Sequence, residues 1–260
     1  MFPSPLTHYK VTRYPVTIEG ETAAIGTASE LAIALDVLHG QHDRAILDQL
    51  QPHLADIVGN AVGLTNVLCV LEPADQIFLI QALGVQLSVV LQQARFLRDL
   101  FAILADDAVE QCLIETLGAT GLRALILTAP ELGEVLEWVY GQRDQQVLDL
   151  LGTPYLKRLI RNGEDLALVL NGLAEPTQAN LIDQLSWSRL IELIDDGREF
   201  AYLLRALPAE LGTRLLEHYS REQLIDLIGN QHDWAYVVDR LEPAEAAVLL
   251  NKLGGASHAA

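Results

Sequence analysis

Cysteine is scarce in this chain of 260 residues. The two cysteines, Cys69 and Cys112, have a spacing that fits neither a disulfide framework nor a CxxC zinc site. We therefore expect a reducing compartment and predict a cytoplasmic protein. Residues 1–10 lack a basic segment followed by an apolar run, and polar residues soon interrupt every apolar stretch. The sequence thus predicts neither a secretory signal nor membrane insertion.

Basic residues are also few, because 17 Lys and Arg stand against 35 Asp and Glu and give a formal net charge of -18. Proteins gain affinity for phosphate backbones when their Lys and Arg side chains release counterions. This composition therefore excludes nucleic acid and anionic lipid as expected partners and favours a basic protein segment. The same acidity would also keep a Leu-rich chain soluble without any partner.

Aromatic residues make up 6% of the chain and Met occurs once, whereas half of all residues are hydrophobic. A core built mainly from Leu, Ala, Ile and Val is typical of an all-helical protein. The chain is long enough to bury a sizeable core, so disorder is not expected over most of its length.

Apolar residues recur with a period of about 34 residues, which predicts a helical repeat. Each repeat opens with an apolar residue, followed by others four and seven positions later, the stripe of an amphipathic helix. The seven opening residues are Leu31, Leu64, Leu97, Leu132, Leu166, Phe200 and Trp234. One such unit cannot bury its apolar face alone, so neighbouring repeats must stack.

A second and a third, shorter helix are predicted in each repeat. Proline often starts the second helix, where its missing N–H would have no intrahelical acceptor. We expect Thr153, Ser186 and Ser220 to cap the third helix. Pairs of small or polar residues are expected to end that helix in the left-handed conformation. These pairs are Gly59–Asn60, Asn162–Gly163, Asp196–Gly197 and Gly229–Asn230.

The predicted fold is an all-α superhelical solenoid of about seven repeats, forming a single domain over residues 27–255. Residues 1–26 do not fit the repeat. Val11, Val16 and Ile18 favour extended structure, whereas Pro15 argues against a central strand. We predict a short hairpin or arm that either covers the first repeat or reaches a second copy of the chain. Residues 256–260 are predicted to form a disordered tail.

Residues 241–250, with the sequence Leu-Glu-Pro-Ala-Glu-Ala-Ala-Val-Leu-Leu, resemble the helical repeats of two families. One is the cytoplasmic N-terminal domain of MgtE-type magnesium transporters, and the other comprises the armadillo-like units of FliG-type flagellar-motor proteins. The resemblance implies a right-handed superhelix and a role in protein interaction or regulation. It does not imply transport, because the transporter's membrane domain is not expected in this chain.

The histidines, cysteines and paired carboxylates that could bind a metal or act in catalysis are better explained by structural roles. His39, His42 and His53 lie near Asp43, but Gly40 falls in a predicted turn, so we expect no metal site there. Cys112 aligns with core positions of other repeats, and Cys69 aligns with solvent-facing ones without a neighbouring histidine. Paired carboxylates such as Asp106–Asp107 and Asp195–Asp196 lie at predicted turns, where they cap helices. We therefore predict no enzymatic activity, no metal and no cofactor.

One variable position of the repeat predicts a binding groove. Its residues change from aliphatic through aromatic to small and charged along the chain: Val37, Val70, Ile103, Trp138, Gly172, Ala206 and Arg240. Trp138 would anchor a partner in this groove, with Arg240 at its far end. Trp187 aligns with exposed positions, and tryptophan is common in interface hot spots. The competing interpretation is that both tryptophans serve internal packing.

These observations predict a scaffold or adaptor that binds a protein, which could be basic, through the solenoid surface. One alternative is an enzyme or small-ligand-binding protein with a site in the groove. Another is a structural protein that forms a homodimer through residues 1–26, and a further one is mimicry of nucleic acid by the acidic surface.

Overall fold

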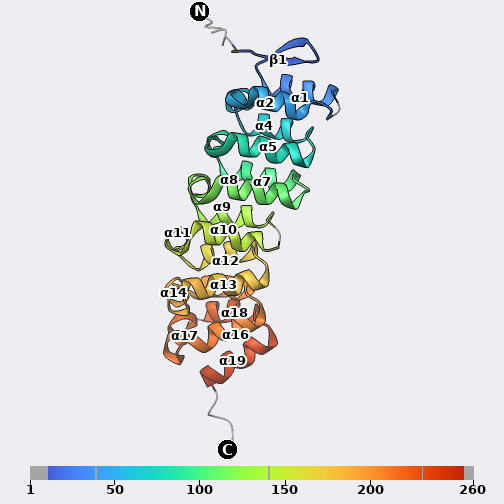
Figure 1. Ribbon diagram of the computed structural model, residues 1–260. Coiled ribbons are helices and arrows are strands. Elements are labelled where there is room, and N and C mark those ends of the chain that lie inside the picture. Colours follow the sequence, from blue (N-terminus) through green and yellow to red (C-terminus); the bar gives the residue numbers. More distant parts are fainter. Residues whose placement is uncertain (1–10, 39, 140, 230, 255–260) are drawn as a thin grey trace, which may run out of the picture. The chain divides into compact units, whose positions relative to one another are not determined.

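A computed structural model describes residues 11–38, 40–139, 141–229 and 231–254 of the protein. The protein is all-α with a short β-hairpin near its N-terminus, which confirms the predicted fold class (Figure 1). The chain divides between Leu125 and Ile126 into two compact units, an N-terminal unit and a C-terminal unit. The superhelical path and the single domain over residues 27–255 stay predictions, and the predicted tail lies outside the described residues.

The N-terminal unit begins with the hairpin and continues with helices in the predicted order of first, second and short third helix. Its elements are β1 (Tyr14–Ile18), β2 (Glu21–Ile25), α1 (Ala28–Val37), α2 (Asp43–Leu50), η1 (Gln51–His53), α3 (Leu54–Val58), α4 (Ala61–Leu68), α5 (Pro73–Leu83), η2 (Gly84–Gln86), α6 (Leu87–Leu91), α7 (Ala94–Ile103) and α8 (Asp107–Leu125). Helix α8 combines a second and a third helix, which meet at a kink at Gly118.

The C-terminal unit repeats the same order. Its elements are α9 (Ala129–Leu136), α10 (Arg143–Leu151), α11 (Thr153–Leu159), α12 (Gly163–Asn171), α13 (Glu175–Leu185), α14 (Trp187–Glu192), α15 (Gly197–Ala206), α16 (Ala209–His218), α17 (Arg221–Ile228), α18 (Gln231–Val238) and α19 (Pro243–Gly254). The first helices of this unit are α9, α12, α15 and α18, and its second helices are α10, α13, α16 and α19.

Equivalent helices of successive repeats pack against one another within each unit (Figure 1). Helix α12 lies between α9 and α15, α15 packs on α18, and α4 packs on α1 in the N-terminal unit. The predicted opening residues provide this packing, since Leu64, Leu166 and Phe200 are fully buried. A helix of 8 to 12 residues is marginal alone in water, so this burial between repeats is what makes the helices stable.

A left-handed residue separates the second from the third helix in four consecutive repeats. Gly84, Gly118, Gly152 and Ser186 follow one another at intervals of 34 residues and have φ angles of 49°, 54°, 74° and 75°. Such a backbone conformation suits glycine, because other residues suffer a clash of Cβ with the backbone. Three of these four positions are glycine. The fourth, Ser186, has the same positive φ although it carries a side chain.

The predicted left-handed ends of the third helices are only partly confirmed. Gly59 has a φ of 69° and does end α3 in this way. Asn162 and Asp196 instead have extended backbones and accept hydrogen bonds from the N–H groups of Asp165 and Glu199, so they cap the next helix. The expectation was wrong there because a short polar side chain that tolerates a left-handed turn is also a good N-cap.

The predicted caps of the third helix also differ from one another. Ser220 forms the predicted capping box with Gln223 at the start of α17. Ser186 occupies the cap position of α14 without a side-chain hydrogen bond to the helix, and Thr153 is the first residue of α11 rather than its cap.

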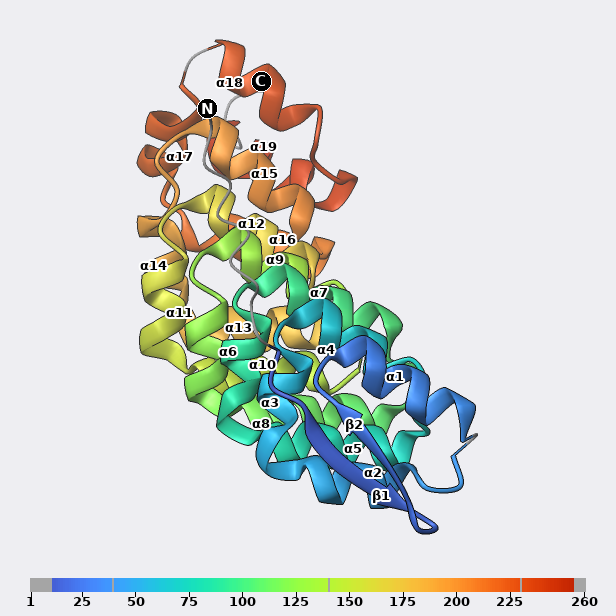
Figure 2. The ribbon, with the colours of Figure 1, turned by 90° about the horizontal axis from the view of Figure 1, so that it is seen from above.

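The hairpin packs on the first repeat (Figure 2). Strand β1 contacts α2 and buries Val16, while the ring of Tyr14 stacks on His53 with 3.9 Å between centroids. The side-chain amide of Gln49 pairs with the Thr17 backbone: Thr17 N–H donates to Oε1 at 2.9 Å, and Nε2 donates to the Thr17 carbonyl at 3.1 Å. The arm therefore covers the first repeat, whereas its contact with a second copy stays a prediction.

By length and composition, one segment of the described chain could cross a membrane, Pro73–Leu91. It comprises α5, η2 and α6, and the positive φ of Gly84 breaks it. Its apolar residues Leu79, Ile80 and Leu87 are buried, and α5 and α6 both pack on α8. Core helices of soluble proteins pass the same test of length and composition, so the segment is weak evidence for a membrane span.

Replacing Ser186 by glycine is expected to stabilise the protein, because glycine adopts the observed φ of 75° without strain. The gain in the free energy of unfolding should be about 1 kcal/mol, and Gly152→Ala should cost about 1–3 kcal/mol. Urea denaturation followed by circular dichroism measures both. Ser188→Gly, two residues further in the same segment, is the matched control and should lower stability by up to about 1 kcal/mol. A loss of stability in Ser186→Gly would contradict the role given to the left-handed turn.

Candidate functional site

Two adjoining depressions mark the surface of the C-terminal unit on either side of α12. The first, of about 250 Å³, lies between α9 and α12, and the second, of about 340 Å³, lies between α12 and α15. Leu168 and Asn171 line both depressions, so they form the ridge between them. We call the two depressions and this ridge the α12 groove. It combines apolar, amide, acidic and basic side chains on consecutive first helices.

Glycine allows the helices beneath the first depression to approach closely. A Cβ atom on Gly133 would lie 2.7 Å from the carbonyl oxygen of Leu168, and a Cβ atom on Gly172 would lie 2.7 Å from the carbonyl oxygen of Gly133. Real Cβ atoms do not approach backbone oxygens so closely, so both positions require glycine. The missing side chains also leave the depression open to solvent, with Glu137 and Pro130 at its edge.

Aromatic and guanidinium groups gather next to the second depression. Tyr202 on α15 and Tyr236 on α18 meet edge to face with 6.2 Å between ring centroids. The Arg240 guanidinium lies 3.5 Å from the Tyr236 centroid and donates to the Tyr236 carbonyl at 3.0 Å. Arg198 donates to the Tyr202 hydroxyl at 3.5 Å, and the side chain of Arg205 is exposed. Tyr and Arg are enriched in interface hot spots, so this composition is typical of a binding surface.

The two tyrosine hydroxyls are chemically different. A hydrogen bond from the Tyr236 hydroxyl, and then the hydrogen bond and charge of Arg198, lower the pKa of Tyr202. The same Tyr202–Tyr236 hydrogen bond raises the pKa of Tyr236, because Tyr236 is the donor and its proton is held.

Two of the three predicted binding residues lie just after first helices of the C-terminal unit, and Trp138 comes one residue after Glu137 of the groove lining. Trp138 follows α9 with 37% of its surface exposed, and Arg240 follows α18 within the tyrosine–arginine cluster. Trp187 lies elsewhere, at the start of α14. Its ring stacks on His218 with 4.8 Å between centroids, and the Arg214 guanidinium lies 5.0 Å from its centroid. These contacts favour the packing interpretation for Trp187.

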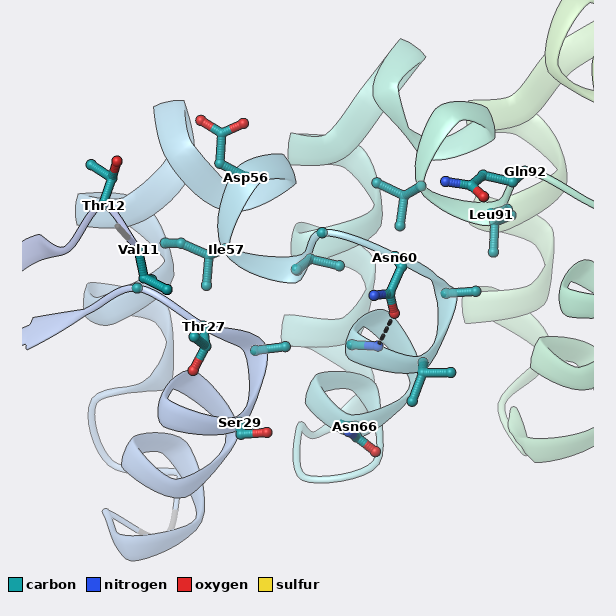
Figure 3. A pocket seen from close by; sticks show the side chains of 18 of the residues that line it. Val11, Thr12, Thr27, Ser29, Asp56, Ile57, Asn60, Asn66, Leu91 and Gln92 are labelled. Atoms are coloured by element: carbon teal, nitrogen blue, oxygen red, sulfur yellow. Dashed lines mark hydrogen bonds between the residues drawn. The ribbon is translucent and has the colours of Figure 1, made fainter. Parts of the chain in front are cut away.

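The N-terminal unit has a wider cleft of about 720 Å³ between the arm, α3 and the start of α4 (Figure 3). Asp56 and Asn60 stand on its walls, and the Asn60 side chain accepts a hydrogen bond from the Gly63 N–H at 3.0 Å. The Tyr14 hydroxyl donates to Asp56 at 3.3 Å. Among the described residues that line it, Asp56 is the one ionised side chain, and the lining holds no His or Cys.

The other candidates of the sequence have clear places. Within the described ranges, no three His, Cys, Asp or Glu side chains gather as a metal site requires, and His39 lies outside those ranges. Cys112 is buried and Cys69 is exposed, as predicted. Asp106 accepts the N–H of Ala108 at 2.8 Å, which confirms its capping role at the start of α8.

Comparison with known proteins found no match, since no family model, curated protein or solved structure matches the chain. The resemblance to MgtE-type and FliG-type repeats therefore stays a prediction, and the functional argument rests on the geometry of the chain itself.

Tyr202 and Tyr236 were not among the predicted site residues. Their spacing of 34 residues carries the signal, since each lies two positions after the opening residue of its repeat, Phe200 or Trp234. That position points away from the buried stripe. Leu168 holds the same position one repeat earlier and is 41% exposed. An exposed leucine followed by two half-buried tyrosines at one repeat position is a pattern that sequence reasoning could have used.

Asp43 is a buried residue whose chemistry the sequence did not predict. Its side chain is 1% exposed, and neither carboxylate oxygen has a hydrogen-bond partner among the described residues. Gln76 and Gln178 hold the same repeat position and donate to the carbonyls of Leu68 and Leu170, both at 2.8 Å. Burial, and then the charges of Asp75 and Glu72, raise the pKa of Asp43.

The substitution Asp43→Gln is expected to stabilise the protein at pH 7 by about 1–2 kcal/mol, because it removes an uncompensated buried acceptor and supplies the amide that Gln76 and Gln178 carry at this repeat position. A raised pKa in the folded state means that Asp43 favours folding when protonated and loses this contribution as pH rises through its folded pKa. The gain should therefore be larger at pH 7 than at pH 3. Urea midpoints at both pH values measure it, with exposed Asp48→Gln as control. An equal gain at the two pH values would contradict the effect of charge.

Proposed function

We propose that the protein is a non-enzymatic scaffold or adaptor that binds an extended segment of a partner protein in the α12 groove. The observation that supports this most directly is the pair of depressions that share Leu168 and Asn171. Leu168 offers apolar surface at the ridge, being 41% exposed, and Trp138 offers more on α9. Apolar and aromatic side chains at the centre of a patch, with charges around them, are the usual composition of an interface.

An extended backbone suits this groove because it presents unpaired N–H and C=O groups. The side-chain amide of Asn171 has one acceptor and two donor hydrogens and can satisfy both kinds of group. Asn171 is exposed at the end of α12, in the middle of the groove. Small residues on both sides, Gly172 and Ala206, leave room for a main chain to approach.

The charges of the groove differ between its two ends. Glu134 and Glu137 line the depression beside α9, whereas Arg205, at the repeat position of Glu137, lines the other depression together with Glu164. A partner would place a basic side chain over Glu137 and an acidic one over Arg205. Packed helices lie about 8–10 Å apart, so two steps span about 16–20 Å. At about 3.3 Å per residue, an extended segment would cover this distance in about five or six residues.

The chain's net charge of -18 supports a partner that is basic overall, since opposite charge accelerates association. Salt weakens this steering more than it weakens contacts within the groove. Together these features support a segment with a basic end, an apolar middle and a single acidic residue.

A display library of random dodecapeptides, selected on the full-length protein, tests the proposal. Enriched peptides should carry Lys or Arg five or six positions from Asp or Glu, with an apolar residue between them. In fluorescence anisotropy, Leu168→Asp should weaken the binding of such a peptide at least tenfold, about 1.4 kcal/mol, because it puts a charge on the apolar ridge. Arg205→Glu should remove the preference for an acidic residue.

The matched control is Leu250→Asp, which changes the same residue type at a more exposed position on α19, where the side chain is 58% exposed. It should leave the dissociation constant unchanged within a factor of two. Peptides that bind Leu168→Asp as well as they bind the unchanged protein would exclude the α12 groove as the site.

A further inference from the structure

A separate cavity lies between the hairpin and the first repeat. It has a volume of about 340 Å³, and both strands, α1 and α2 contribute to its lining. Val16, Ile25 and Ile46 are almost fully buried at its walls, while Ala34 and Leu38 are half-buried. Cavities of about 300–1,000 Å³ with mainly apolar walls are the usual sites of small ligands. The size and the walls fit one small apolar molecule.

The rim of this cavity is acidic. Glu19 and Glu21 flank the hairpin turn and line the opening, together with His42 at the start of α2. Glu19 Oε1 lies 3.5 Å from His42 Nε2. No Lys or Arg belongs to the described lining, whose titratable groups are the carboxylates of Glu19 and Glu21 and the imidazole of His42, and ionised carboxylates attract a cation.

The backbone at the turn holds Glu19 in an unfavourable conformation. Glu19 and Gly20 have φ angles of 53° and 88°, as in the tight two-residue turns of hairpins. Asn, Asp or Gly is preferred at the first of these positions, and a glutamate there is strained. The strained residue is the one whose carboxylate stands at the cavity rim, which fits a role in recognition rather than in folding.

We propose that this cavity binds a small apolar molecule that carries a protonated amine. The apolar body would lie against the half-buried Ile18, Ala34 and Leu38, above the buried Val16, Ile25 and Ile46, and the ammonium group would face the carboxylates of Glu19 and Glu21 at the rim. Charge decides the class of ligand, because an apolar carboxylate of equal size would meet the same walls but be repelled at the rim. This site is independent of the α12 groove.

Isothermal titration of the full chain with three molecules of equal size tests the proposal: 2-phenylethylamine, 2-phenylethanol and phenylacetate. The amine should bind at least tenfold more tightly than the carboxylate, with the alcohol between them. The double variant Glu19→Asn, Glu21→Gln should bring the three affinities within threefold of one another. Asn suits the left-handed backbone of residue 19, so this variant should fold at least as well as the original chain.

Filling the cavity gives a second readout. Ala34→Phe should abolish binding of all three molecules. Ala23→Trp, at an exposed position of β2, should do the same. If one of the two variants fails to fold, the other remains informative. Thermal melting shows which variant is folded. Three results would each overturn the proposal: no saturable binding of the amine, equal affinity for amine and carboxylate, or amine binding that survives in a folded cavity-filling variant.

Discussion

The packing of each first helix on the first helix of the next repeat is the interaction on which each unit depends. Helices α9, α12 and α15 are too short to be stable alone, so their buried stripes must find partners in neighbouring repeats. Between α9 and α12 the approach is so close that Gly133 and Gly172 have no room for a Cβ atom. Because this packing constrains the inward positions, the exposed side chains of the α12 groove, such as Leu168 and Asn171, come from outward positions.

The buried stripe of the first helices and the order of helices in a repeat could be predicted from the sequence. The same apolar pattern recurs about every 34 residues, so each repeat gives separate evidence for the buried positions. The outward residues carry no such redundancy. Tyr202 on α15 and Tyr236 on α18 become part of a candidate site because their rings are in contact. That contact forms only when the two repeats pack together, so neither position reveals it alone. Trp187 shows the same limit, since its stack on His218 could not be predicted from its outward repeat position.

Asp43 and Ser186 show a second limit of reading by repeat position. Two other repeats carry an amide at the position of Asp43, namely Gln76 and Gln178, and three carry a glycine at the position of Ser186. The fold tolerates each exception because the surrounding helices fix the backbone. An alignment of the repeats shows that Asp43 and Ser186 differ from their equivalents. The structure is needed to show that Asp43 is a buried carboxylate and that Ser186 has a strained, positive φ.

The pairing of Gln49 with the Thr17 backbone has a consequence for how the protein loses its structure. A stack of repeats has few contacts between distant parts of the chain, so it frays from its ends rather than from its middle. The hairpin is fastened over the outermost repeat of the N-terminal unit by that amide, by the buried Val16 and by the Tyr14–His53 stack. Unfolding that starts at the first repeat must therefore first detach the hairpin, which belongs to no repeat. The hairpin thus protects the first repeat against local unfolding.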